Sequence, residues 1–153
     1  MRFRTGILSI VLAVAGTALC AAAAPPPQLP PQPAVRPAWV PKGALLVSPC
    51  IAGMGSHWAN PKNLPFGPIY GEYQGKPVFS EIMIDQKAFA KGTNWREQLQ
   101  PLAGYKIDHV DIEFNPYGHA GYPIPHYDIH AYYVSHAVHT KFCPNGEKIR
   151  GSE

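Results

Sequence analysis

Five of the seven histidines of this chain lie in one segment, residues 118–139, which reads GHAGYPIPHYDIHAYYVSHAVH. If residues 124–135 form a β-strand, side chains two residues apart point to the same side of it. Imidazole and carboxylate groups together bind divalent transition metals such as Zn, Fe, Mn, Cu or Ni, and this mixture does not select one of them. We therefore expect a metal-binding face that carries His126, Asp128, His130 and Tyr132.

Strand geometry limits which of these side chains can share one ion. Residues i and i+2 lie about 6.6 Å apart along a strand, and residues i and i+4 about 13 Å apart. His126 and His130 could therefore meet at one ion only across a bend or bulge. A pair of strand residues needs ligands from other elements, and Asp128 could instead orient a histidine by accepting its N–H. The candidates that could complete the site are His57, His119 and Glu81.

The same residues permit a different class of function. Their His/Asp/Tyr face could be a hydrogen-bonded patch, without an ion, on a non-catalytic binding or oligomeric assembly module. We expect His136 and His139 to decorate a chain end rather than to ligate. The sequence has no GxSxG elbow, no glycine-rich phosphate loop and no HExxH motif, so it indicates no particular reaction or substrate.

Strand signals dominate the region that must position these side chains. Residues 68–73 and 76–84 flank a Gln-Gly dipeptide, and two residues with glycine second favour a tight β-hairpin. Residues 105–114 and 124–135 are expected to be further strands that can pair as an antiparallel ribbon. One side of the former would be a solvated face, of interest only if the two polar faces coincide. That side carries His109, Asp111 and Glu113.

One segment has helix signals. Residues 85–102 follow Asp85, which could cap a helix, but Gly92 and Thr93 interrupt the pattern and two short helices are the alternative. Together with the strands, this predicts an α+β, β-rich domain with a mainly antiparallel sheet, curved or barrel-like, and one or two short helices.

The N-terminus has the layout of a secretory signal peptide. Arg2 and Arg4 precede an apolar run over residues 7–15, and small residues follow as far as Ala24. We expect cleavage among Ala22 to Ala24, a periplasmic or secreted mature protein, and no transmembrane segment after cleavage. Losing the two arginines takes the net charge from +3 to +1, because the segment has no acidic residue. Cys20 offers a lipoprotein alternative, which the preceding leucine disfavours.

The 153 residues are enough for one domain with tails. After the signal peptide, residues 1–24, eight of the 17 residues over 25–41 are proline, which predicts an extended linker. Residues 42–149 would form the single β-rich domain, and residues 150–153 a tail. The small net charge, without a cluster of Lys and Arg, excludes a dedicated nucleic-acid binder.

Cleavage of the signal peptide would leave two cysteines, Cys50 and Cys143. Two cysteines in an exported protein predict one disulfide, because the compartment is oxidising. The bond would tie the start of the folded region to its end.

Three segments resemble a family of mostly exported bacterial domains of unknown function. That family is related to a thermophile hypothetical protein known for forming a ring-like oligomer. Its signature is close to PHxDxHxY, with an upstream GH. The resembling segments are MGSHW at 54–58, GPIYGEYQGKPVFSEIMI at 67–84 and GHAGYPIPHYDIHAYYVS at 118–135. The matching residues are Gly118, His119, Pro125, His126, Asp128, His130 and Tyr132.

The resemblance covers most of residues 44–136 and leaves out the linker and the tail. It implies a β-rich fold and a homo-oligomer. It also implies that four of the matching residues act as one functional unit, and it implies neither an activity nor a particular metal. Those four residues are His119, His126, Asp128 and His130.

Overall fold

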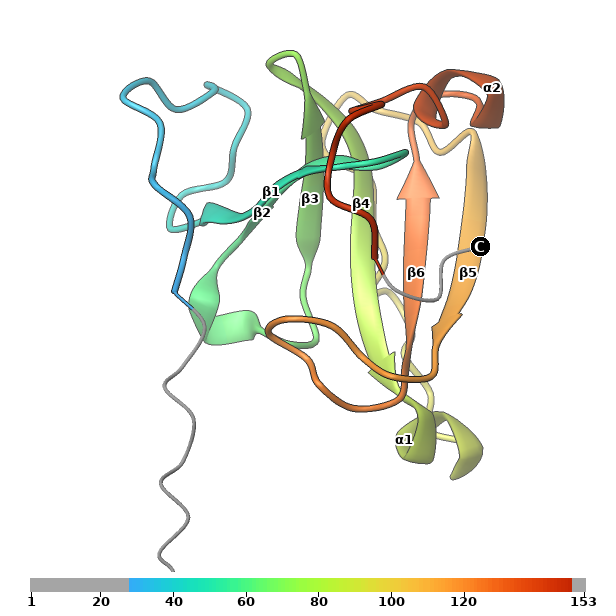
Figure 1. The fold of residues 1–153 in the computed structure, drawn as a ribbon. Helices are drawn as coiled ribbons and strands as arrows, with labels where there is room; N and C mark the ends of the chain where they lie inside the picture. The colour runs from blue at the N-terminus through green and yellow to red at the C-terminus, as the bar shows by residue number, and fades with distance from the viewer. Residues whose placement is uncertain (1–27, 150–153) are drawn as a thin grey trace, which may run out of the picture.

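Six antiparallel β-strands form one sheet, in the order β1-β2-β3-β4-β6-β5, in the computed structural model, which describes residues 28–149 (Figure 1). The expected α+β, β-rich fold is confirmed. The sheet is curved and open, so the barrel-like form of the expectation is wrong, because β1 and β5 stand at opposite ends of the strand order. The strands are β1 (Leu45–Ile51), β2 (Gly55–Ala59), β3 (Ile69–Tyr73), β4 (Lys76–Asp85), β5 (His109–Asn115) and β6 (His126–Tyr132); a 3-10 turn (Pro61–Asn63) and two helices, α1 (Gln86–Ala90) and α2 (His136–His139), complete the order.

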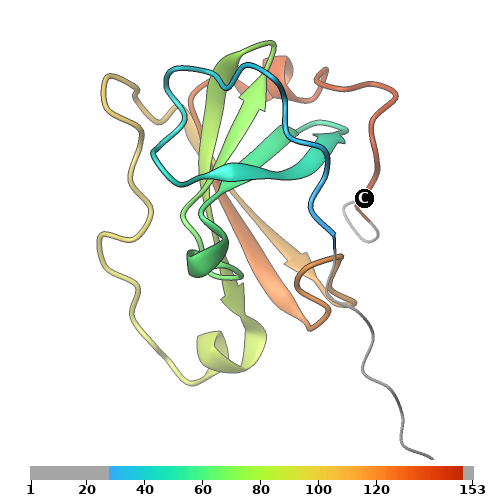
Figure 2. The ribbon, with the colours of Figure 1, turned by 90° about the vertical axis from the view of Figure 1, so that its left-hand side faces the viewer.

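The β1–β2 end of the sheet curls over the side that β4 and β6 present. β1 crosses β3 and β4 in Figure 1, and residues 140–149 descend on the same side, a placement that Figure 2 also shows. A disulfide joins Cys50 of β1 to Cys143, with their Cα atoms 5.8 Å apart, and Ile51 bridges to Glu147. A closed loop of this size contributes about 4 to 5 kcal/mol in the chain-entropy model. The inner side of β4 and β6 is therefore enclosed.

Two of the expected strand pairings are confirmed. The turn between β3 and β4 consists of Gln74 and Gly75, whose φ angles of 51° and 78° fit a two-residue type I′ turn. β5 and β6 pair along their whole length, and this pairing brings the polar side of β5 next to the polar side of β6.

The helix expected over residues 85–102 is wrong for most of its length. α1 covers only Gln86–Ala90, and Oδ1 of Asp85 caps it by accepting two main-chain N–H groups at 2.6 and 3.0 Å. The chain leaves the helix at Gly92, where φ is +73°. Residues 91–108 then run along the side of the sheet opposite the C-terminal segment (Figure 2).

The alternation in β5 is as predicted, but the expectation that its polar side is solvated is wrong. Val110, Ile112 and Phe114 are 47%, 64% and 39% exposed, so the apolar side of β5 faces outward. The polar residues turn inward because the partner strand β6 buries its own polar side. The inward residues are His109, Asp111 and Glu113.

Part of the proline-rich segment packs against the sheet. Val40 is buried with Ala44 and Trp58, and the Gln32 side chain hydrogen-bonds to both main-chain polar groups of Leu46 at 2.8 and 2.9 Å. Packed structure therefore begins before residue 42. The expected signal peptide, Cys20 and the tail lie outside the described residues. None of the helices within residues 28–149 has the length and hydropathy needed to cross a membrane.

Candidate metal centre

The inner sides of β4, β6 and β5 form a grid of polar side chains, because β6 pairs with both of its neighbours. Side chains directly opposite one another in antiparallel strands have Cβ atoms about 4.5–5.5 Å apart. A side chain of β6 can therefore reach groups on both flanking strands. The cross-strand rows are Glu81–His130–Asp111, Met83–Asp128–Glu113 and Asp85–His126–Asn115.

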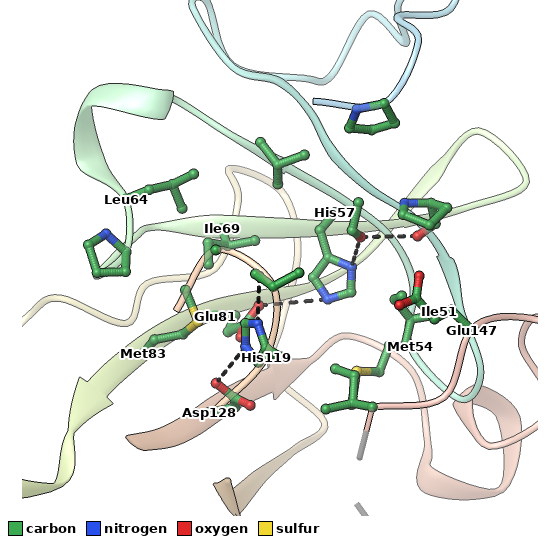
Figure 3. A pocket seen from close by; sticks show the side chains of 18 of the residues that line it. Ile51, Met54, His57, Leu64, Ile69, Glu81, Met83, His119, Asp128 and Glu147 are labelled. Atoms are coloured by element: carbon green, nitrogen blue, oxygen red, sulfur yellow. Dashed lines mark hydrogen bonds and ion pairs between the residues drawn. The ribbon is translucent and has the colours of Figure 1, made fainter. Parts of the chain in front are cut away.

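The first set of possible ligands is the Glu81 group, which consists of His57, Glu81 and His130. Nε2 of His57 lies 3.8 Å from Oε2 of Glu81, and Nε2 of His130 lies 3.5 Å from Oε1 of Glu81. His57 comes from β2, where it pairs with Gly71 of β3, and it points down toward Glu81 in Figure 3. All three side chains are buried. The group offers two imidazoles and one carboxylate to a single point.

A hydrogen-bond chain fixes the orientation of His57 (Figure 3). The hydroxyl of Ser48 donates to the carbonyl oxygen of Pro49 at 3.0 Å, so it accepts the Nδ1–H of His57 at 2.7 Å. A neutral imidazole carries one proton, so Nε2 of His57 presents a lone pair toward Glu81. Metal-ligating histidines are commonly held in this way through their other ring nitrogen.

Burial sets the protonation of the Glu81 group. It lowers the pKa of His57 to about 3 and that of His130 to about 4, so both imidazoles are neutral at physiological pH. Burial, reinforced by the carboxylates of Asp128 and Glu113, raises the pKa of Glu81 well above its usual value. Neutral imidazoles are the ligating form, and a cation between them would favour the ionised form of Glu81.

The second set is the Asp128 group, which consists of His119, His126 and Asp128. Oδ1 of Asp128 lies 3.0 Å from Nε2 of His126 and 3.9 Å from Nε2 of His119. Each histidine donates its Nδ1–H to a main-chain carbonyl, His126 to Ile124 at 2.6 Å and His119 to Ala120 at 2.9 Å. Both Nε2 atoms are therefore directed at the same carboxylate oxygen.

Asn115 holds the other oxygen of this carboxylate. Its Nδ2–H donates to Oδ2 of Asp128 at 3.1 Å, which leaves Oδ1 to face the two histidines. Burial raises the pKa of Asp128, but the interaction with His119, the charges of the other neighbouring histidines and the hydrogen bond from Asn115 outweigh it, and the net shift is downward. Burial opposes protonation of His119, yet Asp128 raises its pKa overall. Asp128 is therefore an ionised, oriented ligand candidate.

Several buried atoms of the two groups have no hydrogen-bond partner within residues 28–149. Two ligand atoms bound to one tetrahedral zinc at about 2.0–2.1 Å lie about 3.3 Å apart. The nitrogen–oxygen separations within the two groups run from 3.0 to 3.9 Å and bracket this value. The atoms without a partner are Glu81 Oε2, Asp128 Oδ1, His126 Nε2 and both ring nitrogens of His130.

Both groups face one cavity of about 430 Å³ under the curled end of the sheet (Figure 3). His126 does not line this cavity, although its Nε2 contacts Asp128. The other walls are mainly apolar, with Met54, Ile69 and Met83 close to the polar floor. The polar floor consists of His57, Glu81, His119, Asp128 and His130.

The structure brings all six predicted metal-ligand candidates to this region, in two groups of three. His126 and His130 fall into different groups, in agreement with their separation along a straight strand. Sequence reasoning did not find Ser48 or Asn115, which orient a ligand in each group. Asn115 continues the alternation of β5, so that pattern contained a signal for it, whereas nothing in the sequence marked Ser48.

Gly71 and Phe79 support the Glu81 group from within the sheet. The Phe79 ring lies over Gly71, and a Cβ added there would overlap the ring. This ring makes T-shaped contacts with His57 and His130, with ring centroids 5.2 and 4.8 Å apart. The missing side chain at residue 71 therefore allows a fully buried aromatic ring to position two imidazoles.

The comparisons with known proteins support the fold and provide no function. No protein-family model matches the chain, and no curated protein matches it. It is similar to the crystal structure of hypothetical protein TTHB210 from Thermus thermophilus, with 27% sequence identity and a TM-score of 0.54. The match covers 61% of this chain and 90% of that one. The chain thus has a distant structural neighbour that is itself a hypothetical protein.

Replacing Gly71 with alanine should displace the Phe79 ring and the two imidazoles that it contacts. Overpacking of this kind costs about 1–3 kcal/mol of unfolding free energy, which chemical denaturation measures. Gly92→Ala is the matched control, because open space surrounds that residue and only its positive φ opposes a side chain, at about 1 kcal/mol. Equal stability of Gly71→Ala and the unaltered protein would contradict this role.

Proposed function

We propose that this protein is an exported metal-binding protein whose cavity holds divalent transition-metal ions at the Glu81 group and the Asp128 group. One observation carries the proposal. Buried carboxylate oxygens and imidazole nitrogens converge at ligand spacing and find no hydrogen-bond partner in the described part of the chain. Leaving such groups buried and unpaired costs free energy, and a cation would satisfy them together.

The histidine tautomers support the same conclusion. In His57, His119 and His126 the Nδ1–H is already donated to a neighbouring oxygen. The remaining Nε2 atoms are therefore available to ligate without breaking any of these hydrogen bonds. A patch built only from hydrogen bonds would instead be expected to use both nitrogens of each ring.

The ligand sets indicate the chemistry that the metal would supply. Each group has two histidines and one carboxylate, a set that leaves coordination positions open in zinc hydrolases and in non-haem iron enzymes. In the Glu81 group, those positions would face the cavity, where water or a small substrate can bind. Zn, Fe, Mn, Cu and Ni all suit such a set, so the metal and the reaction are left to experiment.

Export and family membership belong to this proposal. The disulfide between Cys50 and Cys143 and the apolar N-terminal segment support an oxidising, extracytoplasmic compartment. The PHxDxHxY pattern at residues 125–132 supports membership in the family of exported domains of unknown function. A homo-oligomeric assembly module without metal remains the alternative prediction. Metal analysis distinguishes it from the metal-binding protein that we propose.

The metal content of the purified protein shows directly whether the Glu81 and Asp128 groups bind metal. Glu81→Gln and Asp128→Asn keep the side-chain shape and remove the negative charge, so each should lose about one metal equivalent per chain, and the double variant two. Elemental analysis after loading with Zn²⁺ and removal of excess metal measures this, on protein without a histidine tag. Glu97→Gln, on an exposed loop, is the control and should match the unaltered protein.

An unchanged metal content in the Glu81→Gln/Asp128→Asn double variant would contradict the proposal. So would a failure of the unaltered protein to take up any of Zn, Mn, Fe, Ni or Cu after reconstitution. The assembly-module interpretation would then be preferred.

The hydroxyl of Ser48 offers a test that leaves every ligand in place. Ser48→Ala removes the acceptor that fixes the tautomer of His57, and the loss of such a contact typically weakens metal affinity 10–100-fold. Competition with a metal chelator would measure this weakening, with Ser135→Ala as control, since the Ser135 side chain caps nothing. An affinity that Ser48→Ala leaves unchanged would place the metal away from His57.

A further inference from the structure

We propose that a further metal site lies at the end of the sheet next to α2, where His109, Asp111, His136 and His139 bind a divalent transition metal such as Zn²⁺ through four protein ligands. These four residues are called the Asp111 group. It has no ligand in common with the Glu81 and Asp128 groups, so it stands or fails independently of the proposed function.

The ligands of the Asp111 group converge on one carboxylate oxygen. Oδ2 of Asp111 lies 3.7 Å from Nε2 of His109, 3.8 Å from Nδ1 of His136 and 3.6 Å from Nε2 of His139. These separations are too long for hydrogen bonds. They are close to the spacing of about 3.3 Å expected between two ligands of one tetrahedral zinc. One ligand atom from each residue lies within 4.8 Å of the others.

His109 is oriented as a ligand by its neighbour in the chain. Oδ1 of Asp108 lies 3.0 Å from Nδ1 of His109 and accepts its N–H. Nε2 of His109 therefore carries a lone pair toward Asp111. This nitrogen is buried and has no hydrogen-bond partner within residues 28–149.

His139 is held by the turn between β1 and β2. Its Nδ1–H donates to the carbonyl oxygen of Gly53 at 2.8 Å, which leaves Nε2 to face Asp111 and His136. This Nε2 is hydrogen-bonded to Nδ1 of His136 at 3.1 Å, a bond that a shared metal ion would replace. The His136 side chain is 70% exposed, so its Nε2 can keep the ring proton in water while Nδ1 ligates.

Aromatic packing fixes the positions of two of these rings. His139 stacks on Tyr132 with ring centroids 3.9 Å apart and an interplanar angle of 15°, and His109 stacks on Tyr132 at 5.1 Å and 10°. Tyr132 is 2% exposed. The disulfide at Cys143 anchors the chain four residues after His139. The ligands are thus placed before any ion arrives, which favours binding.

The donor set indicates the kind of site. Three imidazoles and one carboxylate can fill all four positions of a tetrahedral zinc, as in sites that stabilise structure rather than catalyse. The ion would link α2 to β5, two elements that lie side by side at one end of the sheet (Figure 1). With this group, all seven histidines of the chain belong to a possible metal site.

The test uses the full chain carrying Glu81→Gln and Asp128→Asn, so that the cavity groups do not contribute. This background should bind about one Co²⁺ per chain with the strong visible absorption of tetrahedral cobalt, and Zn²⁺ should displace it. His136→Ala removes an exposed ligand and should weaken Co²⁺ affinity by more than the ~10–100-fold that is typical of losing a contact to a ligand. Asp111→Asn should have a similar effect. Val138→Ala, also in α2 and exposed, is the matched control and should bind like the background.

Equal Co²⁺ affinity in the background, in His136→Ala and in Asp111→Asn would overturn the proposal, as would a cobalt spectrum that none of these changes alters. If the background does not fold, His136→Ala in the otherwise unaltered chain should lose one metal equivalent. A different result is expected if the Glu81 and Asp128 groups do not bind metal. In that case the background binds as much metal as the unaltered chain, and His136→Ala still removes one equivalent.

Discussion

The structure depends on how it accommodates polar side chains buried on the inner sides of β4, β6 and β5. Glu81, His126, Asp128 and His130 are each at most 3% exposed. Burying such groups without partners costs free energy, and burying an unpaired charge costs several kcal/mol. Main-chain carbonyls, Ser48 and Asn115 satisfy the outer atoms of the ligand groups, but the atoms that face inward remain. The metal ions that we propose would satisfy these inward-facing atoms.

The architecture follows from the need to enclose that polar face. The curled β1–β2 end brings His57 over Glu81, and the loop between β5 and β6 brings His119 over Asp128. The bond from Cys50 to Cys143 fixes the C-terminal segment on the same side of the sheet. Elements distant in sequence thus supply what one strand cannot, because residues four apart on a straight strand, such as His126 and His130, lie too far apart to share an ion.

Local patterns in the sequence predicted β3 to β6, the hairpin turn, an antiparallel sheet and the six ligand candidates, but they did not predict β2, which carries His57. They could not predict which side of β5 is buried, because alternation alone does not distinguish a solvated polar face from an enclosed one. In the structure the polar side of β5 lies next to the buried polar side of β6, so the apolar side, which includes Ile112, faces outward. The sequence also could not predict which of the six ligand candidates lie together. Strand register and sheet curvature decide which side chains meet. His136 was expected to decorate a chain end, yet α2 brings it to 3.8 Å from Asp111.

The most direct test of the central claim is a crystal structure of the zinc-loaded protein with data on both sides of the zinc absorption edge. We expect two anomalous peaks beside the cavity. One should lie among His57, Glu81 and His130, and the other among His119, His126 and Asp128. Peaks confined to the molecular surface, with the buried imidazoles paired to ordered water instead, would contradict the claim.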